Sequence, residues 1–182
     1  MAQPEPVDPV KLVVAVLYVD TGVLEEALEK LRGIWGETDF VGESHDFDVT
    51  PYYAEEMGAR LQRKLLSFKT LLAPGVLVEA KLQCNGIEDA LAMPQGRRVN
   101  LDVGYLDHHK LVLASVKAAG QKVYLGSGVY ADLMLRYHKG RLCPFEWTFP
   151  DFRDGRYDDE LLAIRTQYLD QLRESANSRS ES

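Results

Sequence analysis

The first pattern along the chain is an unbroken apolar run over 11–19, KLVVAVLYV, in which several side chains are β-branched. Such a run is typical of a central strand that is covered on both faces. Beyond it, apolar residues recur at helical spacing, at Val23, Leu24, Ala27, Leu28, Leu31 and Ile34. Asp20 and Thr21 offer N-caps and Gly36 offers a stop. The pattern therefore predicts a strand followed by a helix over 21–36.

The rest of the chain predicts further strands and helices in alternation. Period-two patterning and β-branched residues predict strands over 38–50, 63–72 and 97–105. A short helical turn or ordered loop is expected over 52–61. Apolar residues at helical spacing predict helices over 75–92, 108–119 and 158–174. Residues 121–142 predict two strands, or one long bent strand, and 143–147 form a candidate edge strand.

The first six elements, β-α-β-β-α-β, match the split β-α-β pattern of ferredoxin-like folds. The sequence therefore predicts an α+β fold with a mostly antiparallel sheet, helices mainly on one face, and an extra helix-strand-strand extension. A three-layer α/β arrangement is the alternative, because element order alone does not decide between the two. A single domain is expected over 10–172. The Pro-rich lead at 1–9 and the polar tail at 173–182 are expected to be disordered.

Composition narrows the class of protein. The chain has 182 residues, 46% of them hydrophobic, and a net charge of −7. The size suits a domain with a real core, and the acidic balance argues against nucleic-acid binding, which needs a basic field. No apolar run approaches the roughly 20 residues that a membrane-spanning helix needs, and no secretory signal pattern begins the chain. Cys84 and Cys143 are isolated, so a reducing cytoplasm is the expected location.

Two predicted strands carry short polar rows on one face, because side chains alternate along a strand. One row follows the strand over 97–105 and consists of Arg98, Asn100 and Asp102. The other follows the strand around residue 130 and consists of Tyr130, Asp132 and Arg136. If the two strands pair, the rows converge, and acids buried beside arginine often mark sites. The alternative is a solvated face whose ion pairs contribute about 0–1 kcal/mol each.

We predict from these rows a pocket that holds an anionic small molecule, a nucleotide or a phosphate ester. Asp102 and Asp132 are the candidate catalytic carboxylates, with Asp132 as a base in hydrolase- or transferase-type chemistry. The candidate ligand-binding residues are Arg98, Asn100, Tyr105, Lys110, Tyr130 and Arg136. Asn85 could reach the same pocket from the helix over 75–92. The alternative is a non-enzymatic, homo-oligomeric interaction module, for example a homodimer joined through a sheet edge or the last helix.

Metal and cofactor chemistry stay unassigned. An acidic segment and its neighbours could supply ligands to a divalent cation, from His45, Asp46, Asp48 and Glu56. The alternative interpretation of that segment is a turn-rich acidic loop. His108 and His109 would point about 100° apart on a helix, which suits a surface better than a shared metal. The chain has no GxxxxGK[ST], GxGxxG or GxSxG motif, and Gly126 to Gly128 indicates a bend or hairpin turn.

Several blocks of sequence resemble one known family. They read FDVTPYYAEEMG, LLSFKTLL, RRVNLDVGYLDHHKLVLASVK, KVYLGSGVYADLMLRYHKG and WTFPDFR. In this order they resemble the uncharacterised prokaryotic family known as domain of unknown function 4416, over about residues 11–157. The family pattern has proline where this chain has Val103, and histidine where it has Gln121. The resemblance implies no established activity, so any function has to be argued from the residues themselves.

Overall fold

The strand predicted from the first apolar run is β1 (Val10–Tyr18), and it is buried along its whole length. The computed structural model describes residues 3, 5–58 and 60–180 of the chain. In it β1 lies between β4 (Gln62–Leu72) and β5 (Val99–Leu106) and runs antiparallel to both. Neighbouring strands on both sides and packed layers on both faces explain why this segment is apolar without alternation.

The described residues form one nine-stranded sheet with antiparallel pairings, in the order β2-β4-β1-β5-β6-β8-β7, with β3 beside β4 and β9 beside β8. The α+β class and the mostly antiparallel sheet are thus confirmed. The remaining strands are β2 (Thr38–Val41), β3 (His45–Asp46), β6 (Lys110–Ser115), β7 (Val123–Gly126), β8 (Val129–His138) and β9 (Arg141–Pro144). The hairpin turn at Gly126 to Gly128 is confirmed between β7 and β8.

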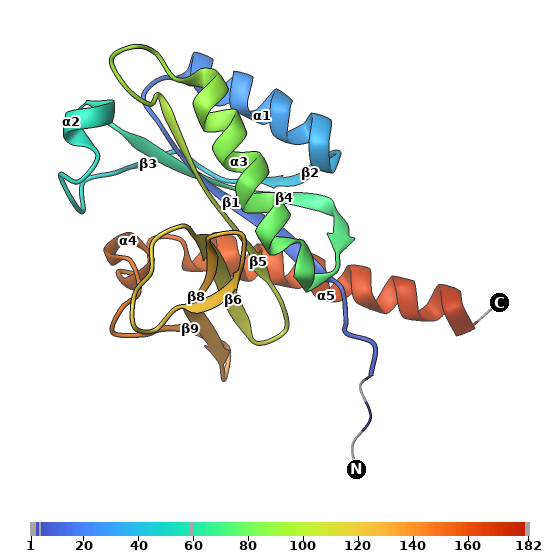
Figure 1. Cartoon of the computed structure of the whole chain (residues 1–182). Helices are drawn as coiled ribbons and strands as arrows, with labels where there is room; N and C mark the ends of the chain where they lie inside the picture. The colour runs from blue at the N-terminus through green and yellow to red at the C-terminus, as the bar shows by residue number, and fades with distance from the viewer. Residues whose placement is uncertain (1–2, 4, 59, 181–182) are drawn as a thin grey trace.

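Helices cover both faces of this sheet (Figure 1). On one face α1 (Thr21–Trp35) lies beside α3 (Leu77–Leu91), which is preceded by the 3-10 turn η1 (Pro74–Val76). On the other face lie α4 (Pro150–Arg153) and the long α5 (Asp158–Ser180). The expectation of helices mainly on one face therefore describes α1 and α3 but not α5. The short α2 (Ala54–Met57) lies in the loop before β4.

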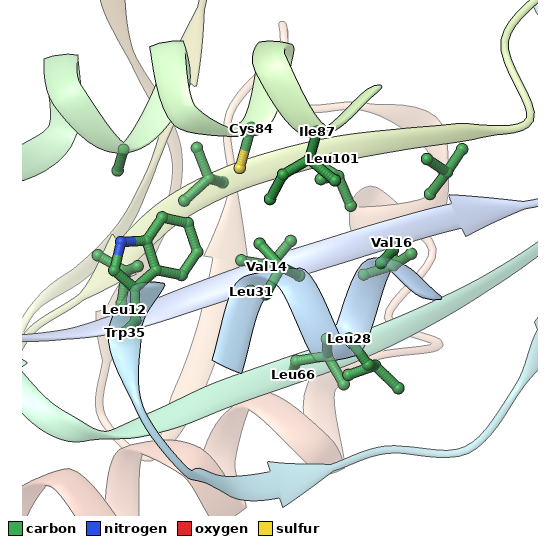
Figure 2. Packing of buried hydrophobic residues seen from close by; sticks show 14 of the residues in the cluster. Leu12, Val14, Val16, Leu28, Leu31, Trp35, Leu66, Cys84, Ile87 and Leu101 are labelled. Atoms are coloured by element: carbon green, nitrogen blue, oxygen red, sulfur yellow. The ribbon is translucent and has the colours of Figure 1, made fainter. Parts of the chain in front are cut away.

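The layer between the sheet and α1 and α3 is a closely packed apolar core. Asp20 caps α1, since its Oδ1 accepts from the Val23 backbone N–H at 2.9 Å. Figure 2 shows side chains of α1 and α3 meeting over β1, among them Leu31, Trp35 and Cys84. Each such buried aliphatic or aromatic side chain contributes about 1.5–3 kcal/mol. The opposite face has its own core, in which Val13, Ala15 and Leu65 pack against Phe152, Leu161, Ile164 and Tyr168.

The prediction of a helix over 108–119 is wrong. Residues Lys110–Ser115 of this segment form β6, which makes a hairpin with β5. Asp107 lies directly before this segment, at a position where an aspartate could cap a helix. Instead its Oδ1 accepts from the backbone N–H groups of His109 at 2.7 Å and Lys110 at 2.9 Å, and its own N–H donates to the Lys110 carbonyl. The same side chain thus closes a tight turn, and the predicted extension begins with a strand rather than a helix.

The C-terminal tail is helical as far as Ser180, which its composition does not predict. The polar tail was expected to be disordered from residue 173, but α5 continues through it to Ser180, while 181–182 lie outside the described residues. Extending an existing helix gains one hydrogen bond per residue without a new nucleus. In the lead, residues 3 and 5–9 have no regular secondary structure, and 1–2 and 4 lie outside the described residues. None of the helices in the described part of the chain combines the length and the apolarity that a membrane crossing needs.

Candidate functional site

The candidate site lies where β5 and β6 part. The two strands pair only at Gly104 with Leu113, Tyr105 with Val112, and Leu106 with Leu111. Beyond Gly104, β6 stays paired with β8 as far as Ser115, so the edge of β5 before Gly104 is left without a strand partner in the described structure. The strands approach very closely at this point, since a Cβ on Gly104 would lie 2.1 Å from the Val112 carbonyl oxygen. Glycine thus permits a close approach of the two backbones, and the strands diverge beyond this contact.

A cavity of about 390 Å³ occupies the space between the diverging strands. Its lining comes from both sides of the sheet, with α3 on one side and β4, α4 and the loop after β3 on the other. The cationic side chains of the lining are Arg63, Lys81, Arg97, Lys117 and Lys122. Its carboxylates are Glu88, Asp102, Asp132 and Asp151. Its aromatic walls are Phe47, Tyr52, Tyr53 and Phe149, so the cavity offers both charge and flat apolar surface to a ligand.

Two charged side chains of α3 replace the missing strand at the edge of β5. Lys81 Nζ donates to the Leu101 carbonyl at 3.1 Å, and Glu88 Oε1 accepts from the Leu101 N–H at 2.7 Å. Both side chains are buried, and they lie 3.8 Å from each other. Burial raises the pKa of Glu88 and outweighs the opposing effects of Lys81 and of the Leu101 N–H. The backbone groups of Leu101 on the free edge are thus satisfied without closing the gap in the sheet.

Arg63 of β4 organises the floor of the cavity on the other face. Its Nη2 donates to Asp102 Oδ2 at 2.9 Å and its Nη1 to Asp151 Oδ2 at 2.5 Å. The guanidinium also lies over the Phe47 ring, 4.7 Å from its centroid. Burial lowers the pKa of Arg63, but the two carboxylates outweigh it and the net shift is upward. The side chain is therefore a fixed, permanently charged group, and it occupies one oxygen of Asp102.

Asp132 of β8 is almost fully buried, at 1% exposure, yet neither of its oxygens accepts a hydrogen bond from the described residues. Among the described residues, Asp132 forms a salt bridge with Lys122, whose Nζ lies 3.3 Å from Oδ2 while donating to Ser115 Oγ at 2.8 Å. Buried polar atoms are normally hydrogen-bonded. Asp132 is therefore an acceptor in the wall of a cavity with no donor satisfying it.

Within the described structure, Asn100 lacks a hydrogen-bond acceptor, whereas Asp132 lacks a donor. Its Oδ1 accepts from Arg97 Nη1 at 2.9 Å, and because a guanidinium only donates, this contact fixes the orientation of the amide. The Nδ2 group is then buried without an acceptor among the described residues. Arg97 itself is held by both carboxylate oxygens of Glu56, each at 2.7 Å. The Asn100 amide is thus a fixed donor in the cavity wall.

Lys117 marks the exposed rim of the cavity. Its ammonium donates to the Tyr52 hydroxyl and lies 4.3 Å from the centre of that ring. It forms no salt bridge with any residue that the structure describes, whereas the other cations of the lining each pair with a carboxylate. Deeper in the cavity, burial raises the pKa of Tyr53, so its hydroxyl stays a neutral donor. The rim therefore carries a positive charge that is in direct contact with no carboxylate of the described residues.

The structure brings three of the sequence-predicted site residues together, Asn100, Asp102 and Asp132, and also places Asn85 in the lining. The other five do not line the cavity. Arg98 pairs with Asp20 at 3.1 Å, and Lys110 pairs with Asp107. Tyr130 packs on Tyr124, and Tyr105 packs against the core under α1 and α3. Arg136 is exposed.

An irregularity in β8 explains the position of Arg136. Leu111 pairs with Leu135 but its neighbour Val112 pairs with Leu133, so β8 contains one extra residue at Met134. Such a bulge reverses the alternation of side chains beyond it. Asp132 faces the same side as Leu113, whereas Arg136 shares the opposite face with Lys110. The expected convergence of the two polar rows therefore holds for Asp132 and not for Arg136.

The acidic segment considered for a metal does not assemble. His45 contacts Glu160 at 2.9 Å, Asp48 pairs with Arg156 at 3.0 Å, and Glu56 holds Arg97. Within the described ranges, no cluster of three or more His, Cys, Asp or Glu side chains is arranged to hold a metal ion. His108 and His109 form the turn between β5 and β6 instead of beginning a helix.

Sequence reasoning missed the cationic side of the cavity. Lys81 and Glu88 occupy the buried stripe of α3 together with Leu77, Ala80, Cys84, Ile87 and Leu91. Charges at helical positions that are otherwise apolar are a detectable signal, because they are almost never buried without a partner. Arg63 gives a similar signal, since it shares the inward face of β4 with Leu65. Lys117 and Lys122 give none, because they lie in a loop.

Comparison of the chain with known proteins gives a match to one protein family. The sequence model of the family described as "Domain of unknown function (DUF4416)" matches residues 8–168. No curated protein and no solved structure matches the chain. The match covers the whole sheet, the residues that line the cavity, and the helices as far as Tyr168 within α5.

Proposed function

We propose a function for the cavity on the premise that this chain belongs to the DUF4416 family, a domain of unknown function. The cavity between β5 and β6 binds an anionic small molecule, a nucleotide or another phosphate ester. Its volume of about 390 Å³ lies within the range of ligand pockets, which runs from about 300 to 1,000 Å³. Aromatic walls and a few convergent polar groups are also typical of such pockets.

The observation that carries this proposal is the local reversal of charge. The chain as a whole has a net charge of −7, yet five cations and four carboxylates line the cavity. Lys117 is the cation without a salt bridge in the described structure, and it lies at the rim. A positive rim on an acidic protein attracts and orients anions at one place. A phosphate group at Lys117 would supply the missing negative charge.

For hydrolase- or transferase-type chemistry, Asp132 is the better of the two candidate carboxylates. One oxygen of Asp102 is occupied by Arg63, whereas both oxygens of Asp132 are free of hydrogen bonds from described residues. A general base has to reach the proton that it removes. Asp102 and Asn100 would then orient the ligand, and Lys122 would stay beside the Asp132 carboxylate, 3.3 Å from Oδ2.

The proposal extends to the fold type and the location of the protein. We propose that β1, α1, β2, β4, α3 and β5 constitute a ferredoxin-like core, because the strand order β2-β4-β1-β5 and the two helical connections suit that pattern. We also propose a cytoplasmic location, which two free cysteines support.

A thermal-shift screen tests the binding proposal. Nucleoside phosphates, sugar phosphates and inorganic phosphate are added with and without Mg²⁺ to the wild type, to Lys117→Gln and to the control Arg136→Gln. A ligand at a hundred times its Kd stabilises the folded state by about 2.7 kcal/mol. We expect this shift in the wild type and in Arg136→Gln, and a smaller one in Lys117→Gln. A shift that Lys117→Gln leaves intact and Arg136→Gln removes would place the anion elsewhere.

A second candidate function, a homo-oligomeric interaction module, rests on the edge strand β7. Val123, Tyr124 and Leu125 are exposed by 64%, 60% and 42%. They lie on the last strand of the sheet order, whose outer edge has no described partner. Apolar, unpaired edge strands are templates for pairing with another chain. Under this proposal two copies join through β7.

Sedimentation velocity over a range of protein concentrations tests the module. The dimer proposal predicts a concentration-dependent dimer in the wild type, which Tyr124→Lys abolishes because a charge blocks the edge. Leu82→Lys is the matched control, since Leu82 is also exposed but lies on α3. A wild type that stays monomeric throughout would exclude β7 as a homodimer edge.

A further inference from the structure

Four buried polar atoms in the cavity wall have no partner within the described structure, and they come from three residues on three different strands. They are the carboxylate oxygens of Asp132 on β8, Nδ2 of Asn100 on β5 and Nε of Arg63 on β4. All three residues line the same cavity. Their side chains are at most a few per cent exposed, with residue values of 1%, 5% and 1%. Because unsatisfied buried polar groups are rare, their convergence points to a ligand.

The types of these atoms specify what the ligand presents. Asp132 needs a donor, whereas Asn100 Nδ2 and Arg63 Nε each need an acceptor. A hydroxyl group supplies both functions, since it donates one hydrogen and accepts at two lone pairs. A ligand with several hydroxyls would satisfy all three positions, whereas an amine would satisfy only Asp132.

The charges around Asp132 argue against a cation at that position. Lys122 already lies 3.3 Å from its carboxylate. Arg63 likewise compensates Asp102 and Asp151, while Lys81 and Arg97 compensate Glu88. Each acid of the lining therefore already has a cation beside it. What Asp132 lacks is a hydrogen-bond donor and not a positive charge, so a neutral hydroxyl fits it better than an ammonium group or a metal ion.

The charge of the ligand belongs at the other end of the cavity. Lys117 at the rim is the cation of the lining that forms no salt bridge with described residues. Tyr52 holds its ammonium by a hydrogen bond and by the face of its ring. A phosphate would pair with the Lys117 ammonium, and hydroxyls of the same ligand would hydrogen-bond to Asp132 and Asn100.

We infer that the ligand is a phosphorylated polyhydroxy compound, whose hydroxyls bind Asp132 and Asn100 and whose phosphate binds Lys117. This inference rests on the proposed function of the cavity. Ribose within a nucleotide and a free sugar phosphate share this chemistry. The hydroxyl groups and not a base carry the recognition at Asp132.

Isothermal titration calorimetry on the full chain tests the inference. The probes are ribose 5-phosphate, 2-deoxyribose 5-phosphate, adenosine 5′-monophosphate, its 2′,3′-dideoxy analogue and inorganic phosphate. Removing a hydroxyl that binds a carboxylate is expected to weaken binding by about tenfold or more in the wild type. In Asp132→Asn this discrimination should shrink to about threefold or less. The control Asp170→Asn makes the same change at an exposed residue of α5. It should keep the wild-type discrimination between the hydroxylated and deoxygenated probes.

The outcomes separate the inference from the proposal beneath it. Hydroxyl-dependent affinity that is lost in Asp132→Asn supports the inference, and the tighter of the ribose and adenosine probes identifies the source of the ligand. Equal binding of the hydroxylated and deoxygenated members of both pairs to the wild type overturns the inference while the anion pocket stands. No binding by any of the five probes overturns both. The wild-type comparison stays decisive even if Asp132→Asn does not fold.

Discussion

Gly104 and Val112 meet at a distance that no side chain permits, since a Cβ on Gly104 would lie 2.1 Å from the Val112 carbonyl oxygen. The contact lies at the last residue pairs of the β5–β6 ladder. On one side of it the strands are hydrogen-bonded, and on the other they enclose the cavity. A single close backbone approach thus sets the position at which the sheet opens.

Gly104→Ala is therefore expected to destabilise the fold by about 1–3 kcal/mol, the usual range for forcing an extra methyl group into a packed position. The obstacle is backbone, which cannot rotate away as a side chain could. Urea denaturation monitored by circular dichroism measures the free energy of unfolding. Gly86→Ala is the matched control, because nothing lies within 4 Å of its added Cβ and alanine favours a helix. Equal stability of the two variants would contradict a close backbone contact at Gly104.

Arg63→Met is expected to cost about 3–5 kcal/mol, because it leaves the carboxylates of Asp102 and Asp151 without their shared cation. Arg136→Met, at an exposed arginine without a salt bridge in the described structure, should change stability by about 0.5 kcal/mol or less. Urea denaturation at neutral pH measures both values.

Lowering the pH provides a second measurement on the same variant. Once unpaired and buried, the two carboxylates favour their neutral forms, so the loss caused by Arg63→Met should shrink as the pH falls and they take up protons. A loss that does not depend on pH would indicate that packing of the Arg63 side chain, not its charge, supports the floor.

The fold was largely predictable where the apolar pattern of a segment fits only one type of secondary structure. α1, α3 and α5 follow from the spacing of their apolar residues, and β1 follows from its unbroken apolar run. The segment KLVLAS was not, because Leu111 and Ala114 are three residues apart, as in a helix, while the same four apolar residues also suit a buried strand. Pairing with β5 and β8 decides between them, and no local pattern contains that information.

The candidate site divides in the same way. Asn100 and Asp102 could be assigned to one face because β5 is regular through them. Arg136 could not, because the extra residue at Met134 reverses the side chains beyond it and leaves no mark in the hydrophobic pattern. Lys122 reaches Asp132 from a loop, and contacts of that kind depend on the folded path of the chain.

Glu88 should give the protein a measurable pH dependence. Burial raises its pKa above the ordinary 4.5 in the folded state. The folded state then binds the proton more tightly than the unfolded state, so this contribution to stability is fully present below about pH 4.5 and is lost as the pH rises through the raised pKa. Glu88→Gln keeps an acceptor for the Leu101 N–H but cannot titrate. The free energy of unfolding of the wild type, relative to that of Glu88→Gln, should therefore fall as the pH rises above 4.5.

The opposite slope would mean that Lys81 and Arg97, which lie 3.8 and 3.2 Å from Glu88, outweigh its burial. Denaturation by urea at several pH values between 4 and 8 decides between the two. Glu79→Gln, an exposed glutamate in the first turn of α3, controls for loss of a charge on the same helix.

Asp132→Asn is expected to leave stability within about 1 kcal/mol of the wild type, or to raise it. A buried carboxylate that accepts no hydrogen bond is unfavourable in the absence of a ligand, although Lys122 lies 3.3 Å from it. Residues kept for binding commonly lower stability, and their replacement often restores it. Thermal unfolding without added ligand measures the effect. A loss above about 2 kcal/mol would mark Asp132 as structural, since only a buried network that needs its charge would be disrupted by so small a change in shape.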